Sequence, residues 1–143
     1  MDTISPIFTE KSIAVLPFVN MSSDPDNEYF SDGVTEEIIN ALTGIQGLKV
    51  IARTSSFAFK GKNIDVRTIG KQLAVTTVLE GSVRKVGQRI RVTAQLVRTD
   101  DGSHLWSKNF DRKLEDIFAT QDEISLLIAD QIRANFGHFD IGD

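Results

Sequence analysis

The chain has 143 residues, of which 41% are hydrophobic and 25% charged, and this is the composition of one ordinary globular domain. It contains no cysteine, which excludes disulfides, thiolate nucleophiles, cysteine-bound zinc and iron–sulfur clusters. Thirteen of the 16 Lys and Arg residues lie between Arg53 and Lys113 beside five acids, so this stretch carries +8 and the remainder −12. Separated charges of this size indicate surfaces that meet a charged partner.

The first third of the sequence predicts a strand, a helix and a second strand after an extended leader at residues 1–10. The apolar run Ile13–Phe18 is typical of a strand that is buried on both faces. A loop-forming stretch then leads into a helix that Gly44 or Gly47 ends, with one apolar face made of Phe30, Val34, Ile38, Ala41, Leu42 and Ile45. We expect Leu48–Arg53 to form a strand parallel to the first, joined to it by a right-handed crossover.

The middle of the chain changes from helical to alternating periodicity. Thr54–Asn63 shows no regular pattern, and Asp65 then caps a short predicted helix that buries Val66, Ile69 and Leu73. Two alternating segments, Thr76–Val86 and Arg89–Thr99, predict a hairpin about Gly87-Gln88. Its register pairs apolar residues on one face, namely Leu79 with Leu96, Gly81 with Ala94, and Val83 with Val92.

The last third predicts another strand and a long helix. A three-residue loop before His104–Asp111 would place Trp106 and Phe110 beside Leu96 and Val92 of the hairpin. The capping box Thr120–Glu123 predicts a helix at about 118–135. The order βαβ(α)βββα therefore predicts a mixed α/β fold, in which about three helices pack on a five-stranded mixed sheet. We assign residues 11–136 to a single domain and residues 137–143 to a tail.

The sequence gives little support for catalysis or for a bound cofactor. Neither His104 nor His138 lies near the Ser of a Gly-x-Ser-x-Gly elbow, and both the dinucleotide fingerprint and the phosphate-binding P-loop are absent. A loop that begins at Asp24 superficially resembles a calcium-binding loop, but Tyr29 and Thr35 occupy the positions that need Gly and a bidentate acid. We therefore expect a chain that is not an enzyme and that binds no cofactor or metal.

The basic hairpin is the most informative surface that the sequence predicts. Its register makes Arg84 and Arg91 direct cross-strand neighbours on the polar face, and like charges in these positions repel each other. Either Glu80 on the same face and solvent compensate this repulsion, or an acidic partner does. We predict a partner surface made of Arg84, Lys85, Arg89 and Arg91.

Six short motifs in order resemble the TolB amino-terminal-like domain over about residues 11–133, and they are Ser12–Asn20, Glu28–Ile38, Arg53–Gly61, Val78–Arg84, His104–Trp106 and Asp116–Phe118. The resemblance implies a mixed α/β domain of multidomain bacterial signalling proteins. In these proteins the domain lies between an adenylate or guanylate cyclase domain, or a winged-helix DNA-binding domain, and a run of tetratricopeptide repeats. The resemblance supplies no catalytic residues.

These observations favour a non-enzymatic regulatory or protein-interaction module from a larger cytoplasmic signalling protein, with the flanking domains as partners. We expect neither nucleic-acid binding nor membrane contact, and a periplasmic location only if the parent protein has a signal or anchor. An alternative is a small-ligand or nucleotide sensor with a cleft at the carboxyl ends of the parallel strands, lined by Tyr29, Ser31, Asp32, Arg53, Ser55, Ser56 and Lys60. A third hypothesis is nucleic-acid binding through the basic hairpin.

Overall fold

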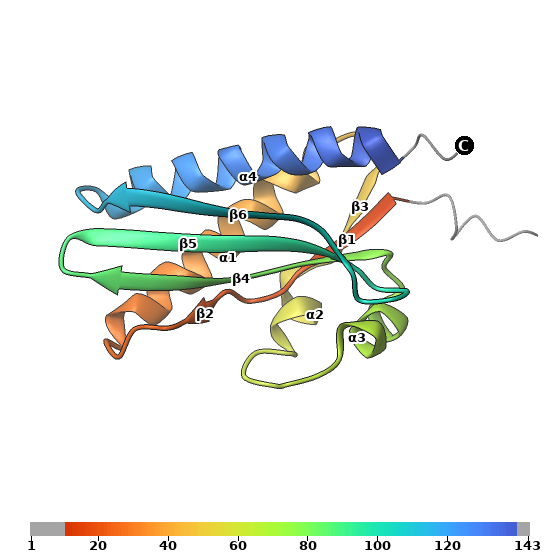
Figure 1. Cartoon of the computed structure of the whole chain (residues 1–143), viewed down its shortest axis with the longest axis horizontal. Helices are drawn as coiled ribbons and strands as arrows, with labels where there is room; N and C mark the ends of the chain where they lie inside the picture. Colours follow the sequence, from red (N-terminus) through yellow and green to blue (C-terminus); the bar gives the residue numbers. More distant parts are fainter. Residues whose placement is uncertain (1–10, 140–143) are drawn as a thin grey trace, which may run out of the picture.

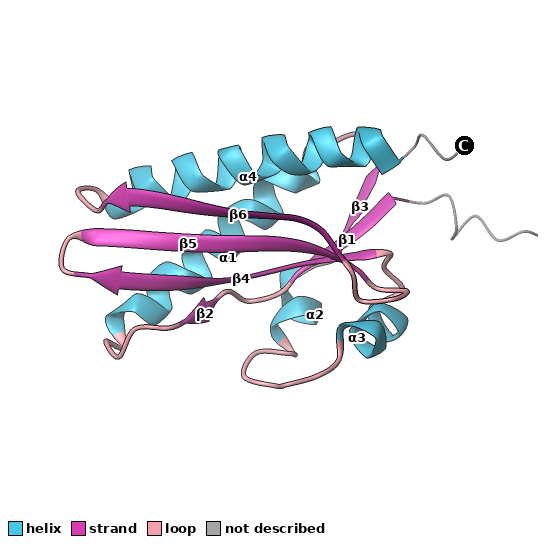
Figure 2. Ribbon diagram, viewed as in Figure 1, coloured by secondary structure: helices cyan, strands magenta, loops and turns pink. Residues whose placement is uncertain are grey.

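The computed structural model describes residues 11–139, and these form one mixed sheet with helices on both faces (Figures 1 and 2). The elements in chain order are β1 (Lys11–Val15), β2 (Val19–Asn20), α1 (Asp26–Thr43), β3 (Leu48–Val50), α2 (Arg53–Phe57), α3 (Val66–Leu73), β4 (Thr77–Val86), β5 (Arg89–Arg98), β6 (His104–Lys113) and α4 (Ile117–Phe139).

The sheet confirms the predicted mixed α/β class. Its strand order is β3-β1-β4-β5-β6, and the two-residue β2 pairs with β4 as a sixth strand that the sequence pattern did not predict. Strand β1 runs parallel to both β3 and β4, whereas β4, β5 and β6 form an antiparallel meander. After β1 the chain continues alongside β4, and this neighbour allows β2 to form. The Met21 amide, directly after β2, donates to the Val83 carbonyl of β4 at 2.8 Å.

The main core lies between one face of the sheet and the two long helices, α1 and α4, which pack against each other (Figure 1). Strand β1 contributes to both faces, as its continuous apolar sequence predicts. The fully buried side chains of this layer include Leu79, Val83, Val92 and Leu96 from the sheet, Val34, Ile38 and Leu42 from α1, and Ile124, Ile128 and Ile132 from α4.

The short helices α2 and α3 cover the opposite face, but only beside the parallel strands. Ala14 of β1 and Val78 of β4 form a second buried cluster there with Ile69 of α3. Asp65 caps α3 as predicted, because its carboxylate accepts the Arg67 amide at 2.8 Å. The rest of this face, on the long meander, carries the predicted polar residues, which are Glu80, Ser82, Arg84, Arg91, Thr93 and Gln95, and all of them are exposed or half-buried.

The hairpin register is the one that the sequence predicts. Leu79 lies opposite Leu96, Val83 opposite Val92, and Arg84 opposite Arg91. Gly87 has a φ of 60°, and among the described residues the only non-glycine with positive φ is Ala74, so Gln88 takes an ordinary conformation. This pattern identifies a type II′ turn, in which only the first central residue needs positive φ.

Gly81 is required by close packing. A β-carbon at this position would lie 2.2 Å from the Thr93 carbonyl oxygen and 2.5 Å from the ring of Phe18. The amide of Phe18 donates to the Thr35 hydroxyl of α1 at 3.0 Å. Phe18 therefore joins the loop after β1, the hairpin and α1 in one contact.

Strand β6 forms one edge of the sheet, and it has charged residues on the core-facing side. Lys108 lies opposite the buried Ala94, and its ammonium is 5.6 Å from the centroid of the Phe110 ring. Arg112 lies opposite the buried Ile90 and donates to Glu123 of α4 at 3.0 Å. Both side chains thus cover apolar surface while their charged groups reach water or an acid.

Three details of the predicted elements differ from the structure, and all three concern short segments. The second parallel strand ends at Val50, because the Ser55 and Ser56 amides both bond to the Ala52 carbonyl and start α2. Trp106 and Phe110 lie beside Leu96 and Val92 as expected, but a β-bulge after Leu96 pairs Val97 with His104, so the loop is not a simple three-residue turn. The structure also has four helices where we predicted about three.

The start and end of α4 also differ from the prediction. The helix begins at Ile117, since Asp116 accepts the Ala119 amide at 3.1 Å and takes the capping role assigned to Thr120, which is buried in the first turn. The helix continues to Phe139, four residues beyond the predicted end and into the segment assigned to a tail. The leader at residues 1–10 and residues 140–143 of the tail lie outside the described residues.

The burial of Leu96 predicts a large loss of stability on truncation. Leu96→Ala should lower the free energy of unfolding by about 3 kcal/mol, because the side chain is fully buried between the sheet and the helices. Leu126→Ala is the matched control, since Leu126 is 60% exposed on α4 and its loss should cost less than about 0.5 kcal/mol. Urea denaturation measures both, and equal losses would contradict the register of the meander.

Candidate interaction surface

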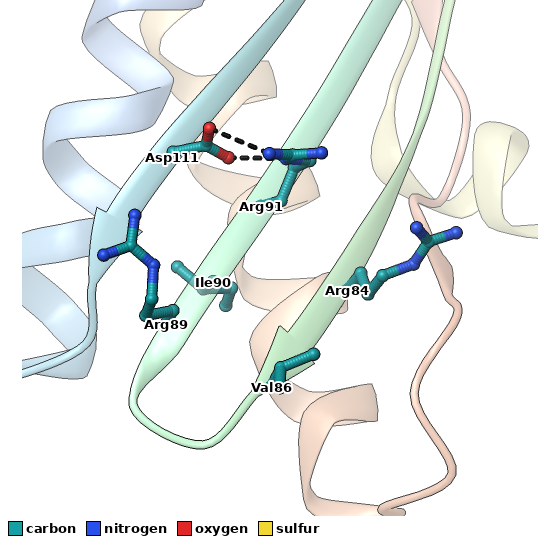
Figure 3. A pocket seen from close by; sticks show the side chains of 6 residues that line it. All are labelled: Arg84, Val86, Arg89, Ile90, Arg91 and Asp111. Carbon is teal, nitrogen blue, oxygen red and sulfur yellow. Dashed lines mark hydrogen bonds and ion pairs between the residues drawn. The ribbon is translucent and has the colours of Figure 1, made fainter.

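The turn between β4 and β5 presents three arginines around a shallow hollow of about 270 Å³, lined by Arg84, Val86, Arg89, Ile90, Arg91 and Asp111 (Figure 3). Alternation along the strands places Arg84 and Val86 of β4 on the outer face, together with Arg89 and Arg91 of β5. Figure 1 shows this turn at the end of the molecule opposite the start of β1 and the end of α4, where the described chain starts and stops.

Arg91 is neutralised by the neighbouring strand. Asp111 of β6 lies directly opposite it, and the guanidinium donates to the two carboxylate oxygens at 2.6 and 3.2 Å. Hydrogen bonding from Arg91 lowers the pKa of Asp111, with smaller help from the nearby charges of Arg89 and Arg112. The sequence left open whether Glu80 with solvent or an acidic partner compensates the Arg84–Arg91 pair, and both alternatives missed the acid that the third strand of the meander supplies.

Arg84 and Arg89 are left without such a partner. Both side chains are exposed, and within residues 11–139 neither forms an ion pair. In Figure 3 the Arg84 guanidinium points away from β5, while Arg89 points toward β6. Exposed Val86, at 73% of its full accessibility, lies between them. The turn thus combines two unpaired positive charges with a small apolar contact area.

Lys85 does not share the outer face with the predicted partner residues. It alternates with Arg84 and lies opposite the buried Ile90, so its side chain belongs to the side of the sheet that α1 covers. There it lines a second hollow with the loop that precedes α1. The structure therefore divides the predicted surface into an outer group, Arg84, Arg89 and Arg91, and a separate lysine.

The charged residues of the predicted ligand cleft all form ion pairs between α1 and the segment around α2. Lys60 lies 2.9 Å from Glu28 and 2.8 Å from Asp32, and hydrogen bonding from Lys60 lowers the pKa of Glu28. Arg53 pairs with Glu36 at 3.0 Å, and its guanidinium carbon is 3.9 Å from the centroid of the Phe57 ring. Acids at four-residue spacing on α1 therefore fasten the segment around α2 to the long helix.

The remaining cleft residues lie in different environments. Tyr29 is 81% exposed, whereas Ser31 is buried and donates to the Asn27 carbonyl within α1. Ser55 is exposed, and Ser56 is buried with a hydroxyl that has no hydrogen-bond partner. Of the seven predicted residues, the structure brings Asp32 and Lys60 into contact. A ligand cleft formed by this set stays a prediction.

Sequence reasoning missed the polar contact between the two long helices. Gln121 of α4 is buried and donates to the Phe30 carbonyl of α1 at 3.2 Å. A β-carbon on Gly33 would lie 2.2 Å from the Gln121 amide nitrogen, so glycine at this position allows the contact. A glycine in the middle of a strongly predicted helix was the available signal.

The described part of the chain has neither a metal-ligand cluster nor a membrane-spanning helix. Residues 11–139 contain no group of three or more His, Cys, Asp or Glu side chains that could hold a metal ion. Within the same residues, none of the helices is both long and apolar enough to cross a membrane.

The sequence matches the family model of the second domain of HilA/YgeH-like transcriptional regulators over residues 9–127. The chain belongs to this family. A curated relative, putative adenylate cyclase 3 of Rhizobium meliloti strain 1021, is 55% identical over 122 residues, which is 85% of this HilA/YgeH-like domain. The match covers 21% of that relative, so the domain spans about a fifth of its length.

Solved structures confirm the expected TolB-like fold of this HilA/YgeH-like domain. TolB from Acinetobacter baumannii superposes with a TM-score of 0.63 at 14% identity, covering 88% of this chain and 28% of TolB. Lipoprotein GNA1162 from Neisseria meningitidis has a TM-score of 0.62 at 20% identity, covering 85% of this chain and 96% of the lipoprotein. At these identities the similarity concerns the fold alone.

The Arg91–Asp111 pair predicts a specific titration behaviour. Asp111 should titrate below the value of about 3.9 that a free aspartate has, and Arg91→Gln should raise its pKa toward that value. The Arg91–Asp111 pair therefore stabilises the meander fully at pH values above the pKa of a free aspartate. Its contribution is lost as the pH falls through the lowered pKa of Asp111. Carboxyl-detected NMR measures the change. Asp65, which Arg67 holds at a pKa of about 2, should not respond.

Proposed function

We propose that this HilA/YgeH-like domain is a non-enzymatic interaction module that docks onto another part of a larger signalling protein. Its family and its relative named as an adenylate cyclase fit a signalling or regulatory module. The observation that carries the docking proposal is the pair of unpaired arginines, Arg84 and Arg89, at the tip of the β4–β5 hairpin. An unpaired charge on a surface favours a partner of opposite sign, which here is an acidic surface.

The position of the hairpin supports docking within one protein. The start of β1 and the end of α4 lie at the opposite end of the molecule from the turn, so the two ends of the described chain leave the tip accessible (Figure 1). The matched segment covers about a fifth of the length of the relative, and this is consistent with a domain that functions next to further domains in one chain. We propose that these neighbours are a cyclase or winged-helix domain and tetratricopeptide repeats, and that the protein is cytoplasmic, as the description of the family as transcriptional regulators suggests.

Protein docking is favoured over nucleic-acid binding by the composition of the hairpin tip. The outer face of the turn carries arginines and Val86 but no aromatic side chain on which a base could stack. Arg91 is paired with Asp111, which removes one of the three charges available for phosphates. Outside the basic stretch the chain carries a charge of −12, which repels a polyanion from most directions.

Binding in trans tests the docking proposal. The 143-residue chain should bind the Rhizobium meliloti relative produced without its own matching segment, and Arg84→Glu with Arg89→Glu should weaken binding at least about tenfold through charge reversal. The matched control is Lys62→Glu with Lys71→Glu, which changes the net charge equally but lies near α3. Calorimetry at about 50 and 150 mM salt should also show weaker binding at the higher concentration.

Two outcomes would contradict docking through the hairpin. Equal weakening by the control pair would mean that only net charge matters. Submicromolar affinity for an oligonucleotide pool at about 150 mM salt, lost with the Arg84 and Arg89 changes, would assign the surface to nucleic acid.

The proposal also predicts the absence of turnover. The purified chain should neither convert ATP to a cyclic nucleotide nor hydrolyse generic esters. Its sequence contains neither a Gly-x-Ser-x-Gly elbow nor a P-loop, and residues 11–139 contain no group of three or more His, Cys, Asp or Glu side chains that could hold a metal ion. Product analysis by chromatography measures this directly. Turnover that follows the pure protein and disappears with a single substitution would refute the non-enzymatic assignment.

A further inference from the structure

A second hollow of about 290 Å³ lies between the loop before α1 and the β4–β5 turn, lined by Ser22, Ser23, Asp24, Asn27, Lys85 and Gly87. The loop is fastened to strand β4 on one side. The Lys85 amide donates to the Ser22 hydroxyl oxygen at 2.8 Å, and Ser22 donates its own amide to the Asn20 side chain at 2.9 Å. The walls of this hollow are therefore fixed by hydrogen bonds that do not involve a ligand.

The side chains that line the hollow include several available hydrogen-bond donors. The Ser22 hydroxyl oxygen accepts from Lys85, which leaves its proton available, and Ser23 adds a second, exposed hydroxyl. The Lys85 ammonium forms no ion pair with any residue from 11 to 139. Two hydroxyls and one ammonium thus belong to residues that line the same small hollow.

Asn27 gives an independent indication of a ligand. Its residue is 6% exposed, and its carboxamide forms no hydrogen bond within the described chain, although both its backbone groups do. Neither carboxamide atom is closed off, because the Ser56 hydroxyl oxygen is the only fully buried, unpartnered side-chain atom among residues 11–139. The amide therefore faces the hollow that it lines, where a bound group can replace water as its partner.

Asp24 is the acid in this wall, and the positive end of α1 offsets its charge. Its carboxylate accepts the Asp26 amide at 2.9 Å, and its carbonyl accepts the Asn27 amide at 3.1 Å. A carboxylate at the start of an 18-residue helix is stabilised by the helix dipole. Glu28, one turn later, pairs with Lys60 at 2.9 Å. Glu28 is thus paired with a lysine and Asp24 with a backbone amide, whereas the Lys85 ammonium forms no ion pair within the described chain.

We propose that this hollow binds a phosphate group, either as the free anion or as a phosphomonoester. A tetrahedral oxyanion offers several acceptors to separate donors, and the Lys85 ammonium, the Asn27 amide and the Ser22 and Ser23 hydroxyls are donors of this kind. The site is distinct from the outer arginines, because Lys85 and Arg84 lie on opposite faces of β4. It also differs from the predicted cleft around Lys60.

NMR titration of the full 143-residue chain tests this site. Amide signals of Ser22, Ser23, Lys85 and Gly87 should shift saturably with inorganic phosphate, with half-saturation near about 1 mM, as a few hydrogen bonds to one charge imply. Lys85→Gln should raise that concentration about tenfold, since a charge-assisted bond is lost. Lys62→Gln is the control, because it removes an exposed lysine that does not line the hollow and should change nothing.

A chloride control and a phosphoserine titration distinguish a specific phosphate site from a general salt effect and a phosphomonoester from the free anion. Sodium chloride at matched ionic strength should not shift these signals, and phosphoserine distinguishes the source of the phosphate. Tighter binding of phosphoserine than of phosphate supports an esterified ligand, and equal binding supports the free anion. Shifts that chloride reproduces, or saturable shifts that Lys85→Gln leaves unchanged, would overturn the proposal. No saturation up to about 50 mM phosphate would also overturn it.

Discussion

The register of the antiparallel meander is the constraint on which the rest of this domain depends. In β4 and β5, alternate residues face the helices and the solvent, so a slip of one residue would bury Arg84 and expose Val83. The turn at Gly87 fixes this register, and the Arg91–Asp111 pair carries it across to β6. The same alternation that builds the core therefore also places the unpaired arginines on the outer face and Lys85 beside α1.

The two long helices depend on this sheet and on each other. Fully buried isoleucines of α4 lie over the meander, and the Gln121 contact at Gly33 brings α4 close to α1. Phe18 links α1 to the strand layer, because its amide donates to the Thr35 hydroxyl of α1 and its ring packs against Gly81 of β4. The Tyr29–Gly33 stretch, which suggested a ligand site, therefore includes residues with clear packing roles, since Phe30 and Ser31 are buried as well.

The sequence predicts the long elements well because one side of each is buried against a single partner layer. The alternation of β4 and β5 and the helical stripe of α1 are examples, and both lie where they were expected. The short β2 and α2 escaped prediction, because two to five residues cannot show a period. Their formation depends on neighbours, namely the edge of β4 for β2 and the carbonyl of Ala52 for α2. The candidate sites were predicted less completely, since partners such as Asp111 and Asn27 come from elements far away in sequence.

The charged core-facing side of β6 affects how readily this domain aggregates through its sheet edge. An edge strand of ten residues offers a template onto which another strand could add, and repeated addition leads to aggregation. A second sheet laid against this edge would have to accommodate Lys108 and Arg112 beside its own apolar face. The cost of desolvating these two charges opposes such growth. The domain can thus keep an open sheet edge and still remain a separate unit when many copies are synthesised side by side.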